Sequence, residues 1–197
     1  MRFDLLPLSV GNGFTETFNA SAAVLRDDPP TGGPTIDSNR LDAFYSLSRT
    51  FAPQPWLTFT PVAGGRVTYY DRATGGRSTY TRTLGEVGFD AALRSSATSG
   101  YKNDSWGIDG LRHLLTPRLI YRYIPEADKG QPYIPPIDRQ TFSTYLQPLD
   151  LGDMRNIDQL HATNTLRLEI DNTIQTRDPT YGSRDLIMLN FASDFRF

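Results

Sequence analysis

Apolar and polar residues alternate with a period of two in one segment of the chain after another, and this alternation most constrains the fold. It is typical of β-strands with one apolar and one polar face, whereas the apolar spacing of an amphipathic helix does not extend over any long segment. The sequence therefore predicts an all-β protein. The clearest strand has Leu166, Leu168, Ile170 and Ile174 on one face and Thr165, Arg167, Glu169, Asp171, Thr173 and Gln175 on the other.

The alternation divides the chain into about eight candidate strands. Asn12-Gly13 and Gly75-Gly76 are tight-turn pairs, and Pro7 weakens the first strand because proline cannot donate to a neighbouring strand. The expected strands are 3–10, 14–26, 41–51, 56–72, 78–96, 106–124, 160–176 and 185–197. The expected loops are 27–39, 52–55, 73–77, 97–105, 125–157 and 177–183.

Strand length and mid-strand charges favour a membrane. The candidate strand at 56–72 has about 17 residues, whereas strands of soluble domains usually have about 5 or 6. Charges such as Glu86 and Asp90 in the middle of a strand must face water, which a barrel lumen provides. No apolar run approaches the roughly 18 to 20 residues of a transmembrane helix. We therefore expect an antiparallel transmembrane β-barrel, and more specifically part of a larger barrel.

The charged face of these strands is the candidate functional surface. We expect its acidic and basic side chains to neutralise one another across strands rather than to act as catalytic acids. The residues expected to face the lumen and to contact lipid or a partner are Glu86, Asp90, Arg94, Arg118, Arg122, Arg167, Glu169 and Asp171.

Catalytic and metal-binding patterns are missing from the sequence. His113 and His161 fall in different segments, and the chain has no cysteine. Asp150, Asp153 and Asp158 lack the ligand spacing and central glycine of a calcium loop, so a solvated loop is the interpretation. We expect no enzyme activity, no cofactor and no metal.

The charge pattern also limits the classes of partner. A net charge of -2 without a basic block predicts no nucleic-acid binding. Of the 20 basic residues only Lys102 and Lys129 are lysine. The guanidinium group of arginine matches pairs of phosphate or carboxylate oxygens, which would suit a lipid headgroup or a saccharide.

Several segments resemble one known family. They are Trp106–His113, Pro117–Pro125, Ile137-Asp138, Asn164–Leu168, Arg40–Ser48, Trp56–Pro61 and Arg66–Tyr70. Over about residues 40–197 they are similar to the lipopolysaccharide (LPS)-assembly protein LptD family, also called organic-solvent-tolerance protein. The resemblance implies a Gram-negative outer-membrane barrel that accepts LPS from periplasmic bridge proteins and releases it into the outer leaflet. It also implies contact with outer-membrane lipid, a plug lipoprotein inside the barrel, and a lateral gate between the first and last strands.

The chain departs from that family pattern in three ways. It has no signal peptide, no recognisable periplasmic jellyroll and none of the family's cysteines. It also has fewer strands than that barrel. We therefore expect residues 1–197 to form a partial outer-membrane barrel domain with a long loop at 125–157. Two alternatives remain open: a complete eight-stranded structural or adhesive barrel, and a soluble β-sandwich that binds carbohydrate.

Overall fold

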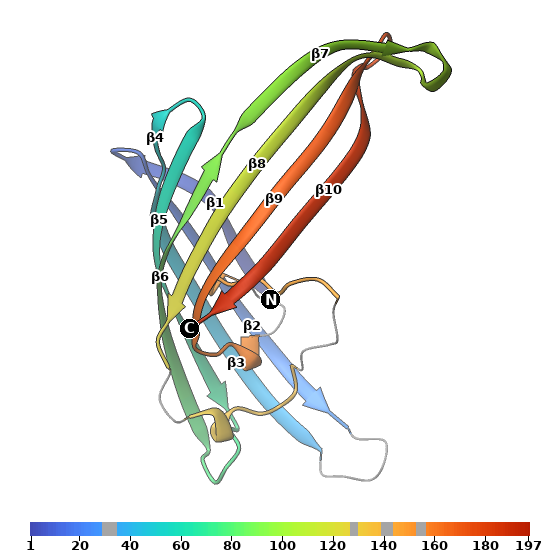
Figure 1. Ribbon diagram of the computed structural model, residues 1–197. Helices are drawn as coiled ribbons and strands as arrows, with labels where there is room; N and C mark the ends of the chain where they lie inside the picture. The colour runs from blue at the N-terminus through green and yellow to red at the C-terminus, as the bar shows by residue number, and fades with distance from the viewer. Residues whose placement is uncertain (29–34, 127–129, 139–143, 153–156) are drawn as a thin grey trace. The chain divides into compact units, whose positions relative to one another are not determined.

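The computed structural model describes residues 1–28, 35–126, 130–138, 144–152 and 157–197. These residues form an antiparallel β-sheet with three short 3-10 helices, which confirms the all-β prediction (Figure 1). The strands are β1 (Arg2–Gly11), β2 (Phe14–Asp27), β3 (Ile36–Arg49), β4 (Phe51–Gln54), β5 (Leu57–Asp71), β6 (Thr79–Leu93), β7 (Ser95–Asn103), β8 (Ile108–Ile124), β9 (Thr163–Asp178) and β10 (Gly182–Arg196). The helices are η1 (Asp104–Trp106), η2 (Gln131–Tyr133) and η3 (Ile157–Gln159).

The main path of hydrogen-bonded strands is β1-β2-β3-β5-β6-β8-β9-β10, with β4 paired to β5 and β7 paired to β8. Thr50 alone separates β3 from β4, and Arg94 alone separates β6 from β7. Ten strands thus arise from eight nearly continuous extended segments, which is the number that the alternation predicts. The path begins at β1 and ends at β10 and does not form a ring in the described part of the chain.

Several expected boundaries are wrong. Residues 36–39, for example, were expected in a loop but begin β3. The segment 97–105 was expected to be a turn, but Ser95–Asn103 forms β7, which pairs with β8, and η1 makes the turn. The segment 52–55 was expected to be a loop, but β4 extends to Gln54 and pairs with β5. In the last two segments the hydrogen bonds offered by a neighbouring strand outweigh local turn preference.

Local chemistry explains the first hairpin. Asn12 and Gly13 have φ values of 50° and 76°, as a tight turn between β1 and β2 requires. Pro7 lies where the β1–β2 register shifts, between Leu5 and Leu8. The proline therefore falls at an irregularity of an end strand, where its missing N–H breaks no regular ladder.

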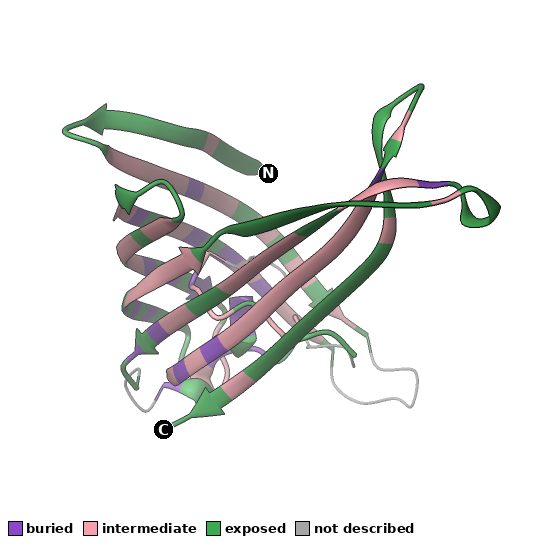
Figure 2. Ribbon diagram, turned by 45° about the horizontal axis from the view of Figure 1, so that its top comes forward, coloured by how far each residue is buried: buried purple, intermediate pink, exposed green. Residues whose placement is uncertain are grey.

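The chain divides into two compact units. Unit 1 comprises Met1–Arg49, Pro61–Gly88 and Arg122–Asn164, and unit 2 comprises Thr50–Thr60, Phe89–Tyr121 and Thr165–Phe197. Within unit 2, β10 pairs with β9 and is exposed along most of its length (Figure 2). No helix in the described residues has the length and apolarity needed to cross a membrane.

The apolar core of unit 1 is small and consists of two clusters. The long loop is the segment between β8 and β9, residues 125–162. In the first cluster, Leu151 of this loop packs against Phe44, Leu84 and Ile124. In the second, Ile134 of the same loop packs against Tyr70 and Tyr80. Each cluster joins strand residues to loop residues, so the described parts of the loop are packed against the strands.

Candidate functional site

The face of β3, β5 and β6 that is buried in unit 1 is charged. Along β6, buried and exposed residues alternate strictly from Thr79 to Glu86. Buried positions along these strands include arginines and acids, while exposed positions of β3 and β5 include the apolar Leu41 and Val67. The buried polar residues of this face are Ser38, Arg40, Asp42, Ser46, Arg66, Thr68, Arg82 and Glu86.

An ion pair links β3 to β5. The register places Asp42 opposite Thr68. Arg66 lies two residues before Thr68 on β5 and therefore on the same face of the sheet as Asp42. Arg66 donates from Nε to Asp42 Oδ1 at 2.9 Å and from Nη2 to Oδ2 at 2.8 Å. Thr68 Oγ1 donates to Asp42 Oδ1 at 2.8 Å. Both charged side chains are 0% exposed, so the bidentate geometry supplies the compensation that a buried pair requires.

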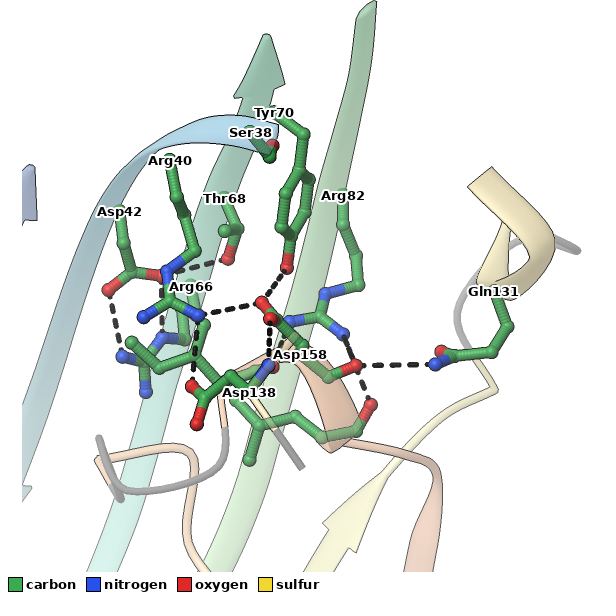
Figure 3. Close-up of polar contacts among 12 residues, drawn as sticks. Ser38, Arg40, Asp42, Arg66, Thr68, Tyr70, Arg82, Gln131, Asp138 and Asp158 are labelled. Carbon is green, nitrogen blue, oxygen red and sulfur yellow. Dashed lines mark hydrogen bonds and ion pairs between the residues drawn. The ribbon is translucent and has the colours of Figure 1, made fainter. Parts of the chain in front are cut away.

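Asp158 of the long loop is the centre of a second polar group (Figure 3). Its Oδ1 accepts from Arg40 Nη1 at 2.7 Å and from the Tyr70 hydroxyl at 2.8 Å. Its Oδ2 accepts from the backbone N–H of Asp138 at 3.2 Å, and the Asp138 carboxylate accepts from Arg40 at 2.9 Å. Asp158 thereby connects β3, β5 and two parts of the loop.

Other residues of the strands form hydrogen bonds with the backbone of the long loop. Arg82 donates to the carbonyl oxygens of Ile157, Asp158 and Leu160. Arg66 donates to the carbonyl oxygen of Leu151, and the Leu151 N–H donates to Glu86 Oε2 at 2.7 Å. These bonds satisfy loop backbone groups that would otherwise be buried without partners.

The β5–β6 hairpin holds another part of the loop. Thr74 donates from its backbone N–H to the Tyr133 carbonyl at 3.0 Å and from Oγ1 to the Pro132 carbonyl at 2.9 Å. The Arg77 guanidinium lies 4.2 Å from the centre of the Tyr133 ring. Gly75 has φ of 65°, and a Cβ there would lie 2.9 Å from that ring. Glycine is therefore required both by the backbone conformation and by the close approach.

The family comparison bears on this site. The model of the family described as "LptD: LPS transport system D" matches residues 7–181. The chain belongs to the LptD family. No curated protein sequence matches the chain. The matched segment includes the strand and loop residues, from Arg40 to Asp158, that form the hydrogen bonds and ion pairs described above.

The eight predicted site residues of this LptD-family chain lie in different settings. Glu86 and Arg122 are buried in unit 1. In unit 2, Arg167 is buried and pairs with Asp194 at 2.6 Å, and its Nη1 lies 4.0 Å from Glu169. Arg118 pairs with Asp171 at 3.0 Å, and both are exposed. Asp90 is half-buried, while Arg94 is exposed at the break between β6 and β7 and outside both strands.

Asp158, at the centre of the network, was not predicted as a site residue. The interpretation of Asp158 as solvated is wrong, because this side chain is 2% exposed. Arg40, Arg66 and Asp138 were named only within the segments that resemble the family, Arg82 was not named, and none of the four was predicted as a site residue. Arg82 has the same strand parity as Glu86, so a longer application of the alternation finds it. Asp153 lies outside the described residues, and the Asp150 carboxylate accepts from the Gly152 N–H at 2.9 Å.

The network joins the strands to the long loop through hydrogen bonds and ion pairs. Guanidinium groups on the strands supply donors, and carboxylates supply acceptors. Among the described residues, no three His, Cys, Asp or Glu side chains gather in a way that could hold a metal.

Proposed function

We propose that this LptD-family chain forms part of the wall of an outer-membrane β-barrel that delivers LPS to the outer leaflet. Family membership supports the role in LPS transport. The observation that supports a membrane location is the distribution of side chains in unit 1. Arg66 and Asp42 are buried, while Leu41 and Val67, on the opposite face, are 55% and 46% exposed.

This distribution is the reverse of that in a soluble sheet. A β-sandwich packs the apolar faces of two sheets together and turns charged residues to water. A membrane barrel turns apolar residues to lipid and encloses a polar interior. The arrangement in unit 1 therefore favours the barrel over a carbohydrate-binding sandwich. The two-ended path of strands favours part of a larger barrel over a complete eight-stranded one.

The polar inner wall would guide the charged part of LPS without covalent chemistry. Under this proposal its ligands are LPS and a plug lipoprotein, and periplasmic bridge proteins deliver the LPS. The wall residues that would contact them are Glu86, Asp90, Arg94, Arg118, Arg122, Arg167, Glu169 and Asp171. Outer-membrane lipid would cover the apolar face.

Spin labels test which face meets lipid. The chain has no cysteine, so single substitutions to cysteine give unique labels. In lipid vesicles, labels at Leu41, Val67 and Leu168 should be relaxed by oxygen dissolved in lipid. Labels at Ser46 and Glu169 should be relaxed by a water-soluble nickel complex. The opposite pattern would overturn the proposed wall.

Photo-crosslinking tests the substrate. A photoreactive residue at Asp90, a half-buried position on the polar face, should form an adduct with LPS in Gram-negative cells that express the chain. The same residue at Val87, on the exposed face, is the matched control and should capture phospholipid instead. Capture of LPS at neither position would count against transport by this wall.

A further inference from the structure

Two buried guanidinium groups in unit 1 suggest a ligand. We propose that Arg40, Arg82 and Tyr70 form a receptor for a phosphate monoester, and that Asp138 and residues 157–160 occupy it as a built-in substitute. This inference rests on the proposed function, because LPS carries phosphate groups on its lipid anchor. It goes further by assigning those groups to a site that the chain itself keeps filled.

In the described part of the chain, Arg82 donates its hydrogen bonds to neutral acceptors. Its side chain is buried, and these bonds go to three backbone carbonyl oxygens of residues 157–160. Among the same residues, its Nε has no hydrogen-bond partner. A buried charge is strongly stabilised by an anion that also accepts its hydrogen bonds. The acceptors that the described loop residues offer Arg82 are neutral carbonyl oxygens, so the charged oxygens of a phosphate would bind this side chain more strongly.

Arg40 shows where the anion belongs. A single nitrogen, Nη1, lies 2.7 Å from Asp158 and 2.9 Å from Asp138, while Nε has no hydrogen-bond partner among the residues that the structure describes. The Tyr70 hydroxyl donates to the same Asp158 oxygen that Arg40 contacts. In Figure 3 the guanidinium groups of Arg40 and Arg82 lie on opposite sides of Asp158. The Asp158 carboxylate thus occupies the point where donors from β3 and β5 converge, and Arg82 of β6 donates to the adjoining backbone carbonyls.

The charges of substitute and ligand match. Asp138 and Asp158 together supply two negative charges, and a phosphate monoester carries about 1.5 to 2 negative charges at neutral pH. Exchange of these carboxylates for one phosphate would preserve the balance around Arg40 and Arg82. The planar guanidinium groups also suit the oxygens of a phosphate.

A cavity next to the site could admit a ligand. A cavity of about 470 Å³ is lined by Asp138, Asp158, Gln131, Thr74 and Ile36. Both acidic residues of the substitute are among those that line this cavity. A phosphate group that entered it would reach the acids it must displace before it reached the arginines.

Calorimetry on the full chain in detergent micelles tests the exchange. The probes are lipid A with its phosphates, lipid A without them, and inorganic phosphate. The Asp158→Asn and Asp138→Asn variants weaken the substitute, and each should bind phosphorylated lipid A at least about tenfold more tightly than the unmodified chain, because loss of a charge-assisted hydrogen bond frees a donor. Addition of Arg82→Gln should abolish this gain, and Arg82→Lys should retain part of it.

Arg177→Gln, which removes an exposed arginine of unit 2, is the matched control and should leave binding unchanged. Circular dichroism shows whether each variant retains its strands, and Asp138→Asn provides the test should Asp158→Asn not fold. Equal binding of the two forms of lipid A by a folded Asn variant would overturn the site, even where LPS crosslinking at Asp90 persists. Inorganic phosphate that binds as tightly as phosphorylated lipid A would support the receptor and count against LPS as its ligand.

Discussion

The ion pairs Arg66–Asp42 in unit 1 and Arg118–Asp171 in unit 2 have the same chemistry and different surroundings. The first is 0% exposed at both side chains, whereas the second is 48% and 38% exposed. Arg66 also donates to the carbonyl oxygen of Leu151 in the long loop. The comparison teaches that a loop segment lying over an alternating charged face can turn an ion pair on that face into part of a buried network.

The same contrast applies to apolar residues. Leu151 of unit 1 is fully buried among strand side chains, whereas Ile187 and Phe191 on β10 of unit 2 are exposed. Unit 1 thus has a conventional, small core between strands and loop. In unit 2 these apolar side chains of β10 are exposed, and in our proposal they contact lipid.

The largest expected effect is the loss of one partner from the buried pair. Asp42→Ala leaves the Arg66 charge buried and removes the acceptor of Thr68, which should lower the free energy of unfolding by about 3 to 5 kcal/mol. Urea unfolding in detergent micelles measures this change. The double variant Asp42→Leu with Arg66→Met should recover most of the loss, because it removes both charges. A loss below about 1 kcal/mol in the single variant would mean that the pair is not desolvated.

A core substitution comes next. Leu151→Ala removes a fully buried side chain of the loop and should cost about 2 to 5 kcal/mol in the same unfolding experiment. Ile187→Ala is the matched change in unit 2 and should cost less than about 0.5 kcal/mol, because that side chain is exposed. Equal costs for the two variants would remove the distinction between a covered and an uncovered region.

The attachment of the loop to the β5–β6 hairpin gives a smaller effect. Gly75→Ala introduces a Cβ at positive φ and against the Tyr133 ring, and should cost about 1 to 3 kcal/mol. Gly76→Ala is also at positive φ, but has open space around its Cβ, so it isolates the backbone strain. We expect the first substitution to cost more and to quicken proteolysis within residues 130–138. Equal costs would show that the ring contact does not hold the loop.

The strands can be predicted from the sequence, whereas the contacts of the polar network cannot. Alternation requires only local information, so Glu86 was assigned to the charged face without knowledge of any partner. The contact of Arg40 with Asp158 joins residues 118 positions apart, and no local pattern in the proline-containing loop signals it. Asp158 has the surroundings of a solvated loop residue in sequence, and only long-range packing buries it. The Ser95–Asn103 strand was missed for a related reason, since its small and polar residues favour a turn until β8 pairs with them.

The exposed pair in unit 2 sets the lower end of the comparison. Arg118→Gln should change the free energy of unfolding by only about 0.2 to 1 kcal/mol, because water solvates both side chains and holding them together costs side-chain entropy. Salt should remove even this effect, since about 1 M salt shortens the screening length to about 3 Å. Unfolding of the Arg118→Gln and unmodified chains at low and high salt measures both terms. The Asp42→Ala defect, in contrast, should persist in high salt, because ions cannot reach a pair enclosed by β3, β5 and the loop. A salt-sensitive Asp42→Ala defect or a salt-resistant Arg118→Gln defect would break the assignment of covered and uncovered faces on which the comparison depends.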